Sequence, residues 1–146
     1  MSPCVGAATP FGRTACHTGR VDVRIKRVYE PAESADGVRV LVDRLWPRGV
    51  SKGAAELALW AKDAAPSAEL RRTWHADPNA HEPDHFHAFA DAYRAELGAE
   101  PAATALRELV SLAERSTRVT LVFGARDERV NHAVVLRDAI LGATAD

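Results

Sequence analysis

No stretch of this chain approaches the ~20 apolar residues that a membrane-spanning helix requires. Cysteine is nearly absent as well. Cys4 and Cys16 both fall in the first twenty residues, which is too little for a disulfide framework and indicates a reducing compartment. A thiol pair there, or a weak metal site with His17, stays open. Both absences favour a cytoplasmic protein without a membrane partner.

A surplus of basic residues is also missing. The chain has 19 Lys and Arg against 20 Asp and Glu, which gives a net charge of -1. General binders of nucleic acid or membrane surfaces carry a basic excess. Nucleic acid is therefore a disfavoured partner, although a small local basic site remains compatible with this balance. The composition leaves the oligomeric state open.

The sequence motifs of several enzyme classes are absent. The chain has no P-loop, no G-x-G-x-x-G and no G-x-S-x-G. A cysteine nucleophile is excluded beyond residue 20, because no cysteine lies there. The serines at 51, 67, 111 and 116 fall at expected helix ends or in loops, without an evident histidine partner. We expect no cofactor, and whether the protein is an enzyme stays open.

What is present suffices for one domain. The chain has 146 residues, of which 47% are hydrophobic, so a core can form without disulfides. Residues 1–20 are rich in Gly, Ala, Thr, Ser and Pro, and we expect them to be a flexible extension. The folded domain should cover residues 21–142, followed by a short tail at 143–146.

Three strands are predicted. Alternating apolar residues in "VDVRIKRVY" indicate a half-buried strand from residue 21, "VRVLVDRL" predicts a second, and residues 119–123 a third. The loop between the first two has only about eight residues, whereas a parallel crossover needs a dozen or more. These two strands are therefore either an antiparallel pair or not neighbours in the sheet.

Helical spacing of apolar residues predicts five helices. The first spans residues 52–63 with Leu57, Trp60 and Ala61 on one face, and the second starts at the N-cap Ser67. The third covers 84–97, the fourth has Pro101 in its first turn, and the last runs from about 128 to 141 with Val130, Val134 and Ile140 inward. This order predicts a small α/β domain with a short sheet of at least three strands flanked by helices.

Polar residues gather where the second and third strands end. In α/β sheets, ligands bind outside the carboxyl ends of strands, and a helix N-terminus there favours an anion. If both ends share one sheet edge, a single pocket could form. The candidate ligand-binding residues are Arg44, Trp46, Arg48, Arg126, Asp127 and Asn131, with His132 as general acid or base.

Each candidate also has a structural interpretation. Arg44 and Arg48 could form ion pairs with Asp43, Asp63 or Asp127. Trp46 could be a core anchor under its loop, and Asp127 the N-cap of the last helix. Asn131 could bond a neighbouring loop, and His132 could be a buried, hydrogen-bonded residue.

A histidine group at 75, 81, 85 and 87 has some of the spacing of a metal site. His81 and His85 are four residues apart, but Pro83 between them argues against a regular helix there. No H-E-x-x-H pattern or cysteine accompanies them. We therefore predict a solvated helix start and no metal site.

Three segments, "IKRVYEPAESADGVRVLVDRLWPRGVSK", "WAKDAAPSAELRRTWH" and "VTLVFGARDERVNHAVVLRDAI", resemble the YeaO-like family of bacterial proteins, over about residues 23–142. The resemblance implies a compact cytoplasmic α/β domain and no established activity. The matching positions are Lys26, Arg27, Tyr29, Asp43, Arg44, Trp46, Pro47, Arg48, Trp60, Lys62, Pro66, Ser67, Leu70, Arg71, His75, Asn131 and His132. Residues 1–20 and His81, His85 and His87 depart from the pattern, whereas His75 lies within it.

These observations lead to one functional expectation and one alternative. We expect a site for a small anionic molecule, bearing phosphate or carboxylate, with acid–base catalysis by His132 or His75 left open. The alternative is a regulatory or protein-binding module without chemistry of its own.

Overall fold

The computed structural model describes residues 21–144, so the expectations for the N-terminal extension, Cys4, Cys16 and His17 lie outside the described residues. Four parallel strands form one sheet in the order β1-β4-β2-β3. The strands are β1 (Val23–Arg27), β2 (Val38–Leu41), β3 (Leu59–Trp60) and β4 (Val119–Phe123). The helices are α1 (Lys52–Ala55), α2 (Ala68–Ala76), α3 (Pro83–Leu97), α4 (Ala102–Glu114) and α5 (His132–Thr144). The predicted small α/β domain is confirmed.

β4 is the centre of the sheet. It pairs in parallel with β1 on one side and β2 on the other, and all five of its residues are buried. A strand buried on both faces explains why residues 119–123 are apolar except for Thr120, whose hydroxyl donates to the Asp36 carbonyl. Because β4 lies between them, β1 and β2 are not neighbours, as one of the two predicted alternatives required.

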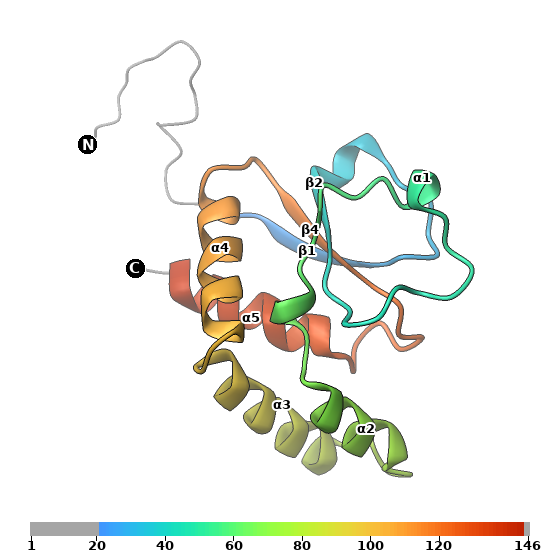
Figure 1. Cartoon of the computed structure of the whole chain (residues 1–146), viewed down its shortest axis with the longest axis vertical. Coiled ribbons are helices and arrows are strands. Elements are labelled where there is room, and N and C mark those ends of the chain that lie inside the picture. The colour runs from blue at the N-terminus through green and yellow to red at the C-terminus, as the bar shows by residue number, and fades with distance from the viewer. Residues whose placement is uncertain (1–20, 145–146) are drawn as a thin grey trace.

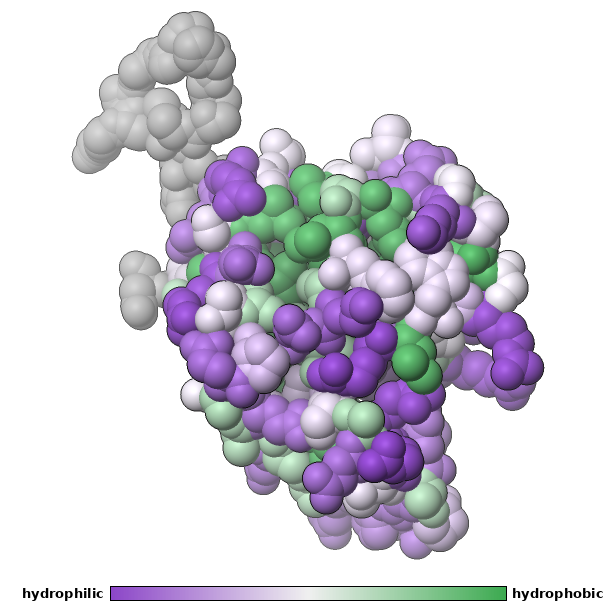
Figure 2. Space-filling model, viewed as in Figure 1, coloured by the Kyte–Doolittle hydropathy of each residue, from purple (hydrophilic) through white to green (hydrophobic). Residues whose placement is uncertain are grey.

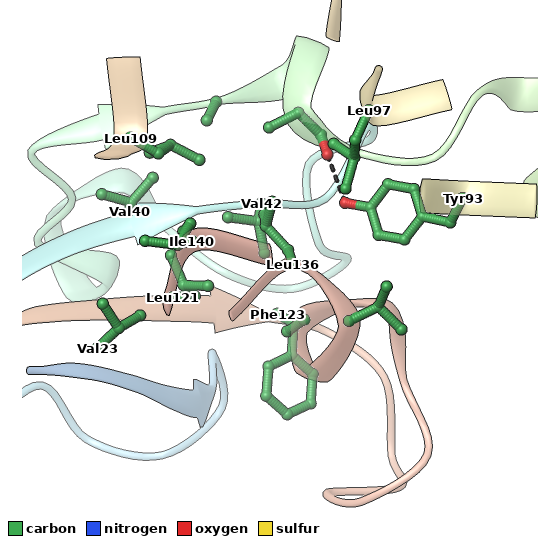
Figure 3. Close-up of a cluster of buried hydrophobic side chains, with 14 of the residues drawn as sticks. Val23, Val40, Val42, Tyr93, Leu97, Leu109, Leu121, Phe123, Leu136 and Ile140 are labelled. Carbon is green, nitrogen blue, oxygen red and sulfur yellow. Dashed lines mark hydrogen bonds between the residues drawn. The ribbon is translucent and has the colours of Figure 1, made fainter. Parts of the chain in front are cut away.

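Different elements pack on the two faces of the sheet. Figure 1 shows α3, α4 and α5 on one side, with α1 and the long loops on the other. Leu121 and Phe123 pack with Leu136 and other helix residues in the main core, part of which is drawn in Figure 3. Val122 points to the opposite face and joins a smaller cluster with Val28 and Ala55. Alternation along β4 thus supplies both cores.

Tyr93 is the largest side chain buried in the main core. Its hydroxyl donates to the carbonyl of Ala64 (Figure 3), which satisfies the polar group inside the core. Burial raises the pKa of Tyr93 above its ordinary value, so the hydroxyl stays neutral.

Among residues 21–144, no helix is long and apolar enough to cross a membrane.

The predicted helix at 52–63 is wrong. α1 ends after one turn, because Glu56 takes a left-handed conformation at φ 47°. The chain then runs beside β2, where Ala58 N–H donates to the Arg39 carbonyl and Ala61 N–H to that of Leu41. The segment becomes the edge strand β3, followed by a 3₁₀ turn at Lys62–Ala64.

The last helix begins later than predicted. Asp127 Oδ1 accepts from the backbone N–H groups of Arg129 and Val130, which forms a separate turn before the helix. Asn131 Oδ1 accepts from Val134 N–H, so Asn131 caps α5 and the interpretation of Asp127 as its N-cap is wrong. Val130 consequently lies outside the helix, and Val134 is only half-buried. The predicted burial of Ile140 and the N-cap role of Ser67 at α2 are confirmed.

Candidate functional site

A cleft of about 520 Å³ opens at the carboxyl edge of the sheet. β2 and β4 are adjacent and parallel, so the segments that follow them emerge at the same edge. All eight residues proposed from the sequence line this cleft: Arg44, Trp46, Arg48, His75, Arg126, Asp127, Asn131 and His132. The structure therefore brings together side chains from both strand ends and from α2.

Asp43, which was not among the candidates, joins the two strand ends. Its Oδ2 accepts a hydrogen bond of 2.9 Å from the backbone N–H of Gly124, just after β4. A Cβ at position 124 would lie 2.9 Å from that oxygen, so only glycine permits this approach. The Asp43 carbonyl also accepts from Trp60 Nε1 at 2.7 Å. Asp43 thereby anchors the floor of the cleft.

His132 completes this junction from the first position of α5. Its Nε2 lies 3.0 Å from the carbonyl oxygen of Val42 and 3.1 Å from Asp43 Oδ1. Both neighbours are acceptors, so Nε2 carries a hydrogen. The hydrogen bond goes to Val42, because Asp43 Oδ1 has no hydrogen-bond partner among the described residues. His132 is thus hydrogen-bonded, as its structural interpretation had it, but half-buried rather than buried.

Four arginines line the cleft: Arg44, Arg48, Arg71 and Arg126. The described residues include no ion pair between any of them and a carboxylate, so the alternative that Arg44 and Arg48 pair with aspartates is not what is found. With Asp43 and Asp127 as the lining carboxylates, the cleft has two positive charges in excess.

The side chains of the four arginines differ in exposure and in their hydrogen bonds to the protein. Arg44 Nε donates to the Pro66 carbonyl at 2.9 Å, so this side chain also holds the chain that enters α2. Arg48 and Arg126 are exposed, and Arg71 is half-buried on α2. Arg71 was not among the site residues proposed from the sequence. It lies four residues before His75, so both side chains are on one face of α2, and this spacing could have identified Arg71 as a site residue.

Aromatic side chains form part of the wall. Trp46 Nε1 donates to the Val50 carbonyl at 2.7 Å, and the ring meets Trp60 edge-on at 5.3 Å between centroids. Trp46 is thus a packing anchor that also lines the cleft. Tyr29, another residue outside the candidates, is 48% exposed and donates its hydroxyl to the Arg48 carbonyl at 3.0 Å. This bond fixes the backbone beside Arg48.

The histidines have separate surroundings. His75 is exposed at the rim, but partial desolvation by the cleft and then the charge of Arg71 lower its pKa, so its neutral form predominates at neutral pH. His81 Nε2 lies 3.6 Å from Asp127 Oδ2, whereas His85 Nδ1 lies 2.7 Å from Asp77 Oδ2. Within residues 21–144, no group of three or more His, Cys, Asp or Glu side chains is arranged to hold a metal ion.

The start of α5 is partly closed to a ligand. Val134 N–H is taken by Asn131, and the N–H groups of Arg129 and Val130 are taken by Asp127. These two backbone hydrogen bonds lower the pKa of Asp127, which stays a carboxylate at neutral pH. The arginines, rather than the helix N-terminus, are therefore the main cationic groups of the cleft.

The fold and the cleft together define a small α/β protein with arginines at the carboxyl edge of a parallel sheet. The chain belongs to the YeaO-like family, in agreement with its sequence resemblance. A family model described as the inactive DUF488-N3 subclade matches residues 22–146.

Two bacterial relatives illustrate the extent of the match. An uncharacterized protein of Mycobacterium tuberculosis (strain ATCC 25618 / H37Rv) is 43% identical over 120 residues, which cover 82% of this chain and 94% of the relative. The uncharacterized protein YeaO of Escherichia coli (strain K12) is 39% identical over 118 residues, covering 81% and 96%. No solved structure matches the chain.

Proposed function

We propose that the cleft binds a small anionic molecule, bearing phosphate or carboxylate, and holds it without chemical turnover. The observation that carries this proposal is the group of four arginines without carboxylate partners in one cleft of a chain whose net charge is -1. A guanidinium group offers paired N–H donors in a plane that matches oxyanions. Grouping unpaired arginines costs repulsion, which a bound anion relieves.

Two observations support binding over catalysis. Among the described residues that line the cleft there is no Ser, Thr, Cys or Lys nucleophile, and Nε2 of the candidate acid or base His132 is already bonded to the Val42 carbonyl. The matching family model is described as inactive. In this proposal His132 holds the strand ends through Nε2, Asn131 is buried and caps α5 beneath the ligand, and His75 contacts the ligand from the rim. The description of the family as inactive also fits the regulatory alternative, in which binding a ligand is the whole function of the protein.

Arg48→Ala and Arg71→Ala test this proposal. Inorganic phosphate, pyrophosphate and citrate are titrated in differential scanning fluorimetry, against sodium chloride at equal ionic strength. A ligand at 100 times its Kd stabilises the native state by about 2.7 kcal/mol. Each variant should weaken binding by about 1.5–3 kcal/mol, because it removes a charge-assisted hydrogen bond. The thermal shift should therefore shrink at equal ligand concentration.

Arg72→Ala is the matched control. Arg72 is next to Arg71 on α2, is exposed and does not line the cleft, so its thermal shift should equal that of the unmodified protein. Equal shifts in all three variants, or a shift that sodium chloride reproduces, would contradict the proposed site. Breakdown of the stabilising compound during incubation would contradict the absence of turnover.

A further inference from the structure

A second surface, away from the cleft, combines an open sheet edge with exposed apolar side chains. β3 is the last strand in the sheet order, so its outer side has no strand partner among the described residues. Two adjoining hollows of about 440 and 470 Å³ lie between β3 and α4 and share Leu59 and Glu108. Figure 2 shows hydrophobic surface gathered in this region, between α4 and the β2–β3 edge.

Leu59 is the centre of this surface, which we call the β3 edge surface; Val38, Ala58 and Leu112 also line it. Only three large hydrophobic residues of the described chain are strongly exposed: Tyr29, Leu45 and Leu59. Tyr29 and Leu45 line the arginine cleft, whereas Leu59, 43% exposed, lies at the sheet edge. An open strand edge next to apolar surface is a ready template for pairing with another strand.

The charges on this surface are complementary to those of a second, inverted copy of the chain. Lys62 and Asp63 lie at one end of the surface, Arg115 lies at the other, and Glu108 lies between them. Two acidic and two basic groups give no preference for an acidic or a basic partner. A two-fold axis through the centre would reverse the ends, which brings Arg115 of one copy toward Asp63 of the other. A chain with a net charge of -1 also repels its own copy weakly.

We propose that two copies of this chain associate through the β3 edge surface, with their β3 strands antiparallel across a two-fold axis. The two four-stranded sheets then continue into each other, and Leu59 of each copy is covered by the other. The arginine cleft stays outside the interface, since β2 and β4 supply its strand ends. Dimer formation and anion binding are therefore separate properties with separate tests.

Leu59→Lys tests the proposal by placing a charge at the centre of the surface. The full chain is studied by sedimentation velocity over a concentration series spanning two orders of magnitude. The unmodified protein should shift from one to two chain masses as concentration rises, and Leu59→Lys should stay at one. Leu45→Lys is the matched control, because Leu45 is also an exposed leucine, at 57%, but lies at another site, and it should associate as the unmodified protein does.

A charge exchange provides a second measurement if Leu59→Lys proves poorly folded by circular dichroism. Asp63→Arg and Arg115→Asp should each weaken association at least several-fold, and the double variant should restore it. The proposal is overturned by a single chain mass for the unmodified protein throughout, by association that survives Leu59→Lys, or by equal loss of association in Leu45→Lys. A double variant no better than either single one would also overturn it.

Discussion

Asp43 shows how one residue can connect three parts of the molecule. Its carboxylate meets Gly124 after β4 and His132 at the start of α5, and its carbonyl receives Trp60 from β3. The backbone of Gly124 must approach the carboxylate closely for this junction to form. The geometry of the cleft therefore depends on a position whose side chain is a single hydrogen atom.

Gly124→Ala should destabilise the protein by about 1–3 kcal/mol, as overpacking of a closely packed site does. The added Cβ would lie 2.9 Å from Asp43 Oδ2, so the carboxylate must move. Gly142→Ala is the matched change, because that position in α5 has no atom within 4 Å of an added Cβ. It should instead stabilise by about 0.5–1 kcal/mol through helix propensity. Urea unfolding of both variants measures the two opposite effects, and equal effects would contradict this account of Gly124.

At the scale of elements, α2 is held by a polar anchor at its first turn and by Leu70 and Trp74, which pack against the main core. None of its residues is fully buried, although it carries Arg71 and His75 into the cleft. The Ser67 hydroxyl accepts from Leu70 N–H and donates to Glu96 Oε2 at 2.6 Å, which ties the start of α2 to the end of α3. The polar contacts of Ser67 therefore add to the aromatic packing of Trp74 on Phe89 in holding α2 to α3.

Ser67→Ala should lower the free energy of unfolding by about 1–2 kcal/mol, since it removes an N-cap and leaves Glu96 without its hydroxyl partner. It should also weaken the phosphate response, because α2 positions Arg71. Ser111→Ala on α4 is the control: that serine is exposed, and its loss should change stability by less than about 0.5 kcal/mol. Denaturant curves and phosphate titrations of both variants check this, and equal losses would argue against the capping role.

The elements that were predicted well have strong local patterns. β4 is apolar at four of its five positions, and α3 repeats apolar residues at helical spacing. β3 was missed because Leu57, Trp60 and Ala61 have helical spacing, while pairing with β2 involves residues far along the chain. The same limit applies to the cleft. Residues directly after strands were found, but Asp43 acquires its contact from Gly124, 81 positions away.

At the scale of the whole molecule, the strand order has a consequence for stability. The link from β1 to β2 must pass β4, and it carries the 3₁₀ turn Ser34–Asp36 over the face opposite the helices. There the Asp36 carboxylate pairs with Lys26 of β1 at 3.1 Å and Arg39 of β2 at 2.6 Å. The Asp36 carbonyl also accepts from Thr120 of β4 at 2.6 Å. One acidic residue therefore links three strands.

Asp36→Asn should destabilise the protein by about 3 kcal/mol or more, since it leaves Arg39, which is 4% exposed, without its charge partner.

Burial alone would raise the pKa of Asp36, but hydrogen bonds from the Glu33 backbone, Lys26 and Arg39 outweigh it and lower the pKa. A carboxylate with a lowered folded-state pKa stabilises above its unfolded-state pKa and loses that contribution as pH falls through the folded-state value. The unmodified protein should therefore lose stability steeply below about pH 4. Asp36→Asn should show a flatter decline in urea unfolding over that range, whereas Asp91→Asn, at a highly exposed aspartate, should keep the original slope. An unchanged slope in Asp36→Asn would mean that other carboxylates control acid unfolding.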